Sequence, residues 1–235
     1  PITPHIEHLV DLAIEEDLGR GDATTDALLL DDVPAEGQIV AKESLVVCGL
    51  DVAEYVFARV GPALRFSSLV SDGDEVTAGT EILVVTGSAS AMLQGERVAL
   101  NFLQRMSGVA TAAHQFVALV SKAGGQARVV DTRKTMPGWR VLDKYAVACG
   151  GGGNHRVDLG SGVLIKDNHI AACGSVWEAI TRARRHAPHT LRIEVEVTNL
   201  QELEEAMEAA PDIVLLDNMT PEMLEESVEL VDGRA

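Results

Sequence analysis

The chain has 235 residues, of which 46% are hydrophobic, and a formal net charge of −17. This length and composition are enough for a sizeable core in one large or two modest domains. The negative charge argues against a nucleic-acid partner, because binding to a phosphate backbone needs clustered Lys and Arg. No apolar run approaches the length of a membrane span and no charged-then-apolar leader opens the chain, so we expect no membrane association. The three cysteines are far apart and form no CxxC pair, which favours a reduced, cytoplasmic setting.

The N-terminal third mixes helical and strand patterns. Apolar residues at helical spacing predict a helix over 5–18, and a loop is expected over 20–26. Strands are expected at 38–48, 63–70 and 81–86, with a helix at 52–60 and a turn at 71–74. This order predicts a small α/β or sandwich-like domain.

A long helical stretch follows, from Ala89 to about Ala123. We expect Gly108 to divide it into two helices, at the boundary between an N-terminal domain over residues 1–110 and a second domain over residues 111–235. The second domain alternates strands and helices, which predicts a parallel sheet with helical crossovers. Its expected strands are 127–131, 162–166, 191–197 and 212–217, and its expected helices are 138–149, 174–187, 199–210 and 221–231.

Charged residues follow each of the four strands expected in the second domain. They are Asp131 to Lys134, Lys166, Glu196 and Asp217. In β/α barrels the functional site lies at the C-terminal ends of the strands. Within 191–197, Leu, Ile and Val alternate with Arg192, Glu194 and Glu196, so the polar set is expected to point into a barrel while the apolar set packs under helices.

The middle of the chain is locally basic within an acidic protein. Residues 131–169 hold six Lys or Arg against four Asp or Glu, whereas residues 194–235 hold one Arg against thirteen Asp or Glu. Cations at the ends of buried strands need an anionic ligand or internal acids to neutralise them. This distribution therefore predicts a small polyanionic substrate.

Several long segments, in order along essentially the whole chain, resemble the quinolinate phosphoribosyltransferase family, nicotinate-nucleotide diphosphorylase (carboxylating). The segments are 95–111, Thr132–Arg140, Lys144–Val147, Gly150–Arg156, Leu164–His169, Glu194–Val197 and Leu215–Asn218. The resemblance implies transfer of the phosphoribosyl group of phosphoribosyl pyrophosphate to the ring nitrogen of quinolinate, with Mg²⁺ as cofactor. Carbon dioxide and pyrophosphate leave, and nicotinate mononucleotide remains for NAD synthesis.

The resemblance also implies an α/β fold with an N-terminal α/β sandwich domain and an open, incomplete parallel β/α barrel. It implies a homodimer, or a dimer-based homo-oligomer, in which each sandwich domain lies over its neighbour's barrel mouth. Family members continue past the strand that ends at Asn218 with further barrel units, including a glycine-rich phosphate loop. This chain ends at Ala235, so we expect those C-terminal barrel units to be absent from it.

The two carboxylates of quinolinate are suited to Arg forks, with Lys and His as additional donors. We therefore expect Arg133, Lys134, His155 and Arg156 to bind the substrate, and the resemblance adds Arg97, which would reach the site of the other subunit. A structural salt bridge to a barrel acid is the alternative for Arg133 and Arg156.

Glu196 and Asp217 are the candidates for holding Mg²⁺, directly or through water, and the ribose, since Mg²⁺ prefers oxygen ligands. Lys166 is expected to face the pyrophosphate or a substrate carboxylate. With Lys134, these three residues form the catalytic set, which would act by positioning and by stabilising the leaving pyrophosphate. The alternatives are an ion pair between Lys166 and Glu196, and acids that only neutralise the site's own cations.

The glycine run 150–153 predicts a loop that lets the backbone approach a ligand, although a linker would look the same. Three other functions remain open. They are a paralogous phosphoribosyltransferase with another acceptor, similar to relatives associated with molybdenum transport; a Schiff-base barrel enzyme that uses Lys166 with Glu196; and an inactive, truncated form.

Overall fold

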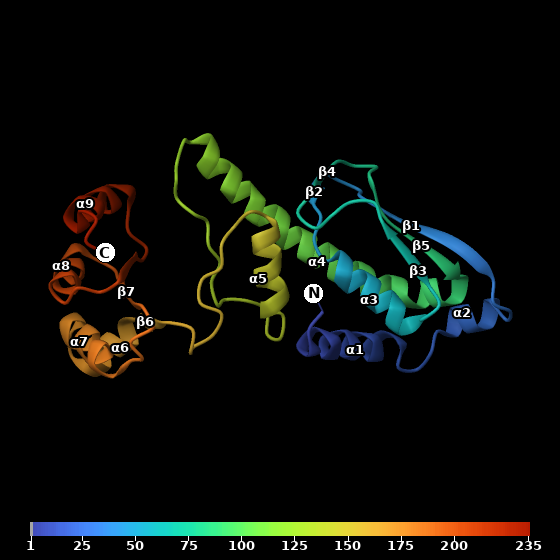
Figure 1. Cartoon of the computed structure of the whole chain (residues 1–235), viewed down its shortest axis with the longest axis horizontal. Coiled ribbons are helices and arrows are strands. Elements are labelled where there is room, and N and C mark those ends of the chain that lie inside the picture. Colours follow the sequence, from blue (N-terminus) through green and yellow to red (C-terminus); the bar gives the residue numbers. More distant parts are fainter. Residues whose placement is uncertain (1) are drawn as a thin grey trace. The chain divides into compact units, whose positions relative to one another are not determined.

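The structure, a computed structural model that describes residues 2–235, consists of two compact units that divide between His155 and Arg156 (Figure 1). The first contains five helices and five strands among its described residues, and the second contains three strands and four helices. The domain boundary predicted at residues 110 and 111 falls inside the helix α4 (Ala89–Lys122). The predicted domain limits therefore differ from the limits of these two units, and they stay a prediction.

The first unit is built on an antiparallel sheet with the strand order β1-β5-β3. These strands are β1 (Pro34–Val40), β3 (Arg65–Ser68) and β5 (Glu81–Ser88), and β2 (Leu45–Val46) pairs separately with β4 (Glu75–Val76). The single strand predicted over 38–48 is therefore wrong in extent. The chain leaves the three-stranded sheet at Ala41, whose backbone bonds to Thr80 and Gly79 instead of continuing the ladder.

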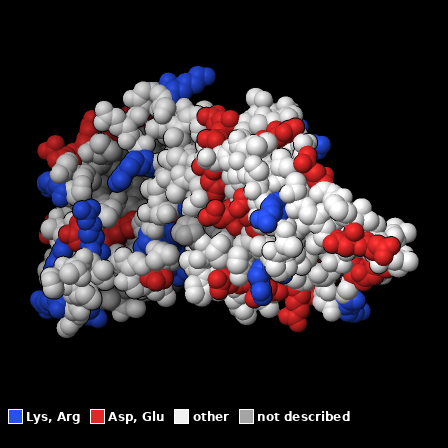
Figure 2. All heavy atoms as spheres, turned by 45° about the vertical axis from the view of Figure 1, so that its right-hand side comes forward, with Lys and Arg blue, Asp and Glu red and all other residues white. Residues whose placement is uncertain are grey.

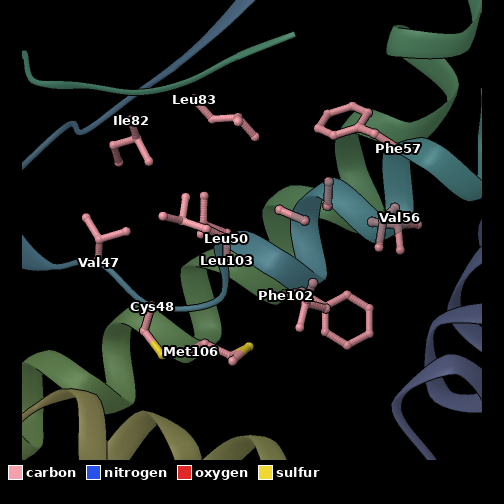
Figure 3. Packing of buried hydrophobic residues seen from close by; sticks show 14 of the residues in the cluster. Val47, Cys48, Leu50, Val56, Phe57, Ile82, Leu83, Phe102, Leu103 and Met106 are labelled. Atoms are coloured by element: carbon pink, nitrogen blue, oxygen red, sulfur yellow. The ribbon is translucent and has the colours of Figure 1, made fainter. Parts of the chain in front are cut away.

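Helices α3 and α4 cover one face of this sheet and form the core with it (Figure 1). The helices of the unit are α1 (Pro4–Leu18), α2 (Ala23–Leu28), α3 (Leu50–Val60), α4 and α5 (Arg140–Cys149). Leu83 of the sheet, Val56 of α3 and Phe102 of α4 are at most 2% exposed, and Figure 3 shows the sheet residues opposite the two helices. Burying each such side chain stabilises the fold by roughly 1.5–3 kcal/mol.

The helix α4 runs through Gly108 without a break, so the predicted division into two helices is wrong. Met106, Ser107, Ala110 and Ala113, on both sides of the glycine, are all buried. This continuous buried face offsets the cost of about 1 kcal/mol that one glycine brings to a helix.

Local capping creates structure where periodicity predicted none. The helix α2 occupies part of the expected loop, because the Asp22 carboxylate accepts hydrogen bonds from the N–H groups of Thr24 and Thr25. Conversely, the strand expected over 127–131 is reduced to one parallel bridge between Val130 and Gly153.

The second unit is an open parallel sheet with the strand order β6-β7-β8, and its described residues form no closed barrel. The strands are β6 (Val163–Ile165), β7 (Ile193–Val197) and β8 (Ile213–Leu216), and the helices are α6 (Asp167–Cys173), α7 (Val176–His186), α8 (Leu200–Glu208) and α9 (Pro221–Val231). Val195 and Val197 pack in one core with Ile180 of α7 and Leu203 of α8, as the alternation in this strand predicts.

The helix starts in this unit follow side-chain caps. Thr220 caps α9, with Pro221 at its first position. At the start of α8, Asn199 accepts from the N–H of Glu202, whose carboxylate in turn accepts from the N–H of Thr198. The helix α6 was not expected, and it begins where the Nδ1 of His169 accepts from the N–H of Lys166.

On the face drawn in Figure 2, Lys and Arg side chains lie scattered among Asp and Glu side chains and form no continuous basic strip. Within residues 2–235, no helix combines the length and the apolar character that crossing a membrane requires.

The packing of α4 predicts opposite outcomes for two glycine-to-alanine changes. At Gly108 an added Cβ meets nothing within 4 Å, so Gly108→Ala should raise the free energy of unfolding by about 0.5–1 kcal/mol. At Gly150 the Cβ would lie 2.2 Å from the Ala110 carbonyl oxygen, so Gly150→Ala should lower it by about 1–3 kcal/mol. Urea unfolding of both variants checks this. Equal stabilities would contradict the packing described for α4.

Candidate functional site

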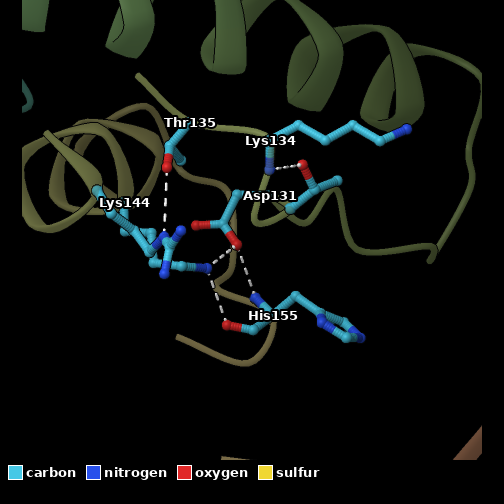
Figure 4. Close-up of polar contacts among 7 residues, drawn as sticks. Asp131, Lys134, Thr135, Lys144 and His155 are labelled. Carbon is cyan, nitrogen blue, oxygen red and sulfur yellow. Dashed lines mark hydrogen bonds and ion pairs between the residues drawn. The ribbon is translucent and has the colours of Figure 1, made fainter. Parts of the chain in front are cut away.

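A buried ion pair fixes the start of the locally basic stretch of residues 131–169, called the basic segment below. The Lys144 ammonium lies 2.5 Å from Oδ1 of Asp131, and the two side chains are only 5% and 7% exposed. Both groups also bind the backbone of His155: its N–H donates to Asp131 Oδ1 at 2.8 Å, and its carbonyl accepts from Lys144 at 3.0 Å (Figure 4). The Asn154 amide, oriented with its nitrogen toward Asp131, donates to Oδ2 at 2.8 Å and to the Lys144 carbonyl at 3.0 Å. The network thus joins 131 to 154–155 across α5.

A second set of contacts holds the loop between Asp131 and α5. Asp143 accepts from the N–H of Met136 at 3.2 Å and from the Arg105 guanidinium of α4 at 2.9 Å. The ring of Trp139 stacks on Phe102 with a centroid distance of 4.8 Å. Both ends of the loop are therefore anchored to the core, which limits the conformations open to the residues between them.

The predicted substrate-binding residues of the first unit differ in their surroundings. Arg133 is half-buried, and its Nε is buried without a hydrogen-bond partner among the described residues. The Lys134 side chain is exposed and extends away from Asp131, as does the imidazole of His155 (Figure 4). Arg97 is exposed on α4, one turn from the half-exposed Leu93.

Arg156, the first residue of the second unit, donates from Nη1 to the Gly162 carbonyl at 2.8 Å. Its Nε, like that of Arg133, is buried with no partner in residues 2–235. A guanidinium that is desolvated and incompletely bonded carries a free-energy cost, which an added acceptor would offset.

The charged strand ends of the second unit come together in one sheet. Lys166, directly after β6, forms an ion pair with Glu196 of β7. Asp217 follows β8 and accepts from the Asn218 amide at 2.9 Å. Because Glu196 pairs with Leu215 in the ladder and side chains two residues apart share a face, Glu196 and Asp217 lie on the same face of neighbouring strands. The alternative of a Lys166–Glu196 pair is confirmed, and it excludes neither residue from binding a ligand.

The glycine run has a packing role that its sequence did not reveal. A Cβ at Gly150 would overlap the Ala110 carbonyl of α4, and one at Gly152 would lie 2.7 Å from a methyl group of Val147. Glycine is therefore required for contact with the protein's own helices, so close approach to a ligand is not needed to explain the run.

Sequence reasoning missed the central role of Lys144 and Asp131, which it used only as part of a motif and as a strand end. The buried Leu142 and Ala146 lie two residues from Lys144 on the same helix, and positions two apart point to roughly opposite sides. Because lysine is almost never fully buried, the sequence pattern did not mark Lys144 as a buried, paired charge.

Two family models together match nearly all of the chain. The model described as quinolinate phosphoribosyl transferase, N-terminal domain, matches residues 22–107, and the one described as the C-terminal domain of the same family matches residues 109–235.

Named relatives agree with these models. A probable nicotinate-nucleotide pyrophosphorylase [carboxylating] of Synechocystis is 42% identical over 93% of this chain and 73% of its own length. One from Methanocaldococcus jannaschii is 44% identical over 94% of this chain and 76% of its own length. The crystal structure of NadC from Streptococcus pyogenes superposes with a TM-score of 0.93 at 41% identity, covering 100% of this chain and 82% of that one.

We predict that Lys144→Met lowers the free energy of unfolding by about 3–5 kcal/mol, because it leaves the buried Asp131 carboxylate without its counter-charge. The fluorescence of Trp139 in a Trp177→Phe background follows unfolding of the first unit in urea.

Two further variants control this measurement. Adding Asp131→Asn to Lys144→Met removes the stranded charge and should restore part of the loss. Arg59→Met breaks the exposed Arg59–Asp11 bridge, whose side chains are 48% and 45% exposed, and should cost no more than about 1 kcal/mol. If Lys144→Met costs no more than Arg59→Met, the pair does not fix this segment.

Proposed function

This chain belongs to the quinolinate phosphoribosyltransferase family, and we propose that it transfers the phosphoribosyl group of phosphoribosyl pyrophosphate to quinolinate. The products would be nicotinate mononucleotide, carbon dioxide and pyrophosphate, in NAD biosynthesis. The observation that carries the proposal is the 42% identity, over 93% of the chain, to a relative named for this reaction.

The cations of the basic segment are proposed to bind the two carboxylates of quinolinate. Arg133 and Arg156 each keep a buried Nε without an acceptor, and a bidentate carboxylate supplies such acceptors. Lys134 and His155 add further donors, with the His155 backbone held by the Asp131–Lys144 pair. We assign these four residues to substrate binding.

Glu196 and Asp217 are proposed to hold Mg²⁺. The donors fit, since Mg²⁺ prefers oxygen ligands and is bound by one or two carboxylates together with waters and substrate phosphates. The two acids lie on one face of neighbouring strands, at the ends where β/α folds place their ligands. When bound, Mg²⁺ would neutralise charge on the pyrophosphate.

The protein's own contribution is positioning and electrostatics. As the ribose carbon parts from pyrophosphate and bonds to the ring nitrogen, positive charge develops at the ribose and negative charge on the leaving group. Lys166, beside Glu196, is proposed to face that negative charge, together with Lys134. The ring nitrogen becomes cationic once bonded and accepts the electron pair left by the departing carbon dioxide, so no protein nucleophile is required.

The Lys166–Glu196 pair argues against the alternative of a Schiff-base enzyme. A lysine that acts through a Schiff base needs a neutral amine with a free electron pair, whereas an ammonium paired with a carboxylate has none. The pair therefore favours an electrostatic role for Lys166. A paralogue with another acceptor is the second candidate, and the match to family models named for quinolinate phosphoribosyl transferase favours quinolinate.

A homodimer is part of the proposal. Arg97 is exposed on α4, and this helix and β1 border a groove that Met92, Leu93 and Leu100 line in part. The exposed Leu93 gives this surface an apolar contact for a second subunit. We also propose a cytoplasmic location, where the three free cysteines would stay reduced.

We predict that Arg133→Ala and Arg156→Ala each weaken quinolinate binding by about tenfold or more, because a charge-assisted hydrogen bond contributes roughly 1.5–3 kcal/mol. Calorimetric titration of the intact protein with quinolinate measures this directly. Turnover is followed through release of carbon dioxide and pyrophosphate.

Glu196→Gln is the contrasting variant. It should keep quinolinate affinity within about twofold while it reduces turnover and changes the Mg²⁺ requirement. If the wild-type protein neither binds quinolinate nor releases carbon dioxide from it, the proposed function is wrong. If both Arg variants bind quinolinate like the wild type, the assignment of these residues is wrong.

Sharing of the site between subunits predicts complementation. Arg97→Ala and Lys134→Ala should each be inactive alone, and mixing them under conditions of subunit exchange should restore activity. One site of each heterodimer then has both residues intact, while the other lacks both. Native mass spectrometry confirms the exchange. A fully active monomer, or confirmed exchange with no recovered activity, would contradict the shared site.

A further inference from the structure

A cluster of metal-ligating side chains lies in the first unit, apart from the residues assigned above. Cys48, Asp72 and Cys149 place two thiol sulfurs and a carboxylate oxygen within 4.8 Å of one another, and no other group of three such ligands is found in the described part of the chain. Tetrahedral Zn²⁺ with bonds of about 2.0–2.3 Å sets its ligands roughly 3.3–3.8 Å apart. Small side-chain adjustments would therefore bring these atoms to bonding distance of one ion.

The three ligands come from separate segments that are each held independently. Cys48 precedes α3, and its N–H donates to the Ser107 hydroxyl of α4 at 3.0 Å. Its sulfur points away from Ile82 and Leu83 of the sheet (Figure 3). Cys149 is the last residue of α5. A site assembled from three fixed segments loses little conformational freedom when an ion binds.

Asp72 already serves the fold, and its present role leaves capacity for a ligand. Its Oδ1 accepts from the N–H groups of Gly49 and Leu50 at the start of α3, at 2.9 and 3.1 Å. Its Oδ2 accepts from the Tyr145 hydroxyl at 2.9 Å. A carboxylate has about four lone-pair sites, so it can cap the helix and coordinate a cation together. Capping explains Asp72, but it does not explain two thiols beside it.

A cavity of 170 Å³, lined in part by Gly49, Asp72, Met106 and Tyr145, adjoins the cluster at Asp72. The cavity has room for water, and Tyr145 reaches the carboxylate from its edge. Either the phenolic oxygen or a water molecule can therefore complete four-coordination.

We propose that Cys48, Asp72 and Cys149 bind one thiophilic divalent cation of the Zn²⁺ class, with Tyr145 or water as the fourth ligand. Thiolates select Zn²⁺ over the oxygen-seeking Mg²⁺, so this site is chemically separate from the one assigned to Glu196 and Asp217. Binding displaces the protons of the two thiols, whose pKa values burial raises, and leaves two metal–thiolate bonds. The ion would link α5 to the start of α3.

The test uses Co²⁺ as a spectroscopic substitute for Zn²⁺. The whole protein, freed of bound metal and kept reduced with a phosphine, is titrated with Co²⁺. We expect one equivalent per chain to give thiolate-to-cobalt charge-transfer absorption and the intense visible bands of a four-coordinate ion, and we expect one equivalent of Zn²⁺ to abolish both.

Three variants assign the signal. Cys149→Ser should lose the charge-transfer band of one thiolate and weaken binding by more than the about 10–100-fold that loss of an outer partner costs. Asp72→Asn should weaken binding, while the amide oxygen of the new side chain can still accept from the N–H groups of Gly49 and Leu50. Cys173→Ser, at a cysteine outside the cluster, is the matched control and should bind like the wild type. Circular dichroism confirms that each variant is folded.

The proposal fails if the reduced wild-type protein shows no thiolate-to-cobalt band, or if the band survives unchanged in folded Cys149→Ser. It also fails if Cys173→Ser removes the band, because the ion would then bind elsewhere. None of these readouts depends on quinolinate or on turnover, so they are independent of the proposed function.

Discussion

The ion pair between Asp131 and Lys144 is the interaction on which the basic segment depends. A charge that is nearly excluded from water must be paired and hydrogen-bonded, and each of these two charges also forms a hydrogen bond with the backbone of His155. The need to pair these buried charges therefore fixes the relative positions of the backbone segments that carry and contact them. The chain after Asp131 and the chain around His155 are held side by side, where only a single bridge, between Val130 and Gly153, takes the place of a regular strand pair. A buried network of paired, hydrogen-bonded charges favours one arrangement, and here it holds the backbone of His155 in place.

Two arginines near this network, unlike the ion pair, have hydrogen-bonding capacity that the protein's own groups do not use. Asp131 and Lys144 pair with each other, whereas Arg133 and Arg156, like Arg105, each have a buried Nε without a hydrogen-bond partner within residues 2–235. Natural structures rarely keep such groups without a reason, and functional sites are among the places where they do. The net charge of −17 strengthens the point, because a protein with so many acids had ample means to neutralise these guanidinium groups internally. In the proposed function, the carboxylates of the substrate supply the missing acceptors of Arg133 and Arg156, whereas Arg105 keeps its ion pair with Asp143.

Sequence patterns predicted most elements of the second unit, because apolar residues of a parallel strand and of its covering helices follow the two periods faithfully. They failed where a single side chain or contact decides the local structure. Asp22 starts a helix of six residues, too short for any periodicity, and Gly108 did not end α4, because buried positions continue on both of its sides. For the site, charges at strand ends could be read from the sequence, and so could their order. The burial of Lys144 could not, because an ammonium on a helix is ordinarily solvated, and its partners, the Asp131 carboxylate and the His155 carbonyl, lie 11 or more residues away in the sequence.

Helix α5 contacts several separate segments of the first unit: the loop before it, the backbone of His155, and the residues Asp72 and Cys48. Its first turns carry Asp143 and Lys144, which hold the loop before it and the backbone after it. The following residue, Tyr145, points instead to Asp72, and the helix ends at Cys149 beside Cys48. Consecutive positions on a helix diverge by about 100°, so neighbouring residues necessarily serve different surroundings. A cation bound at the end of α5 would therefore restrain the same rigid body that positions His155. Because Ala146 is packed without any exposure, the middle of this helix is fixed against the core, between the residues that hold His155 and the end that carries Cys149.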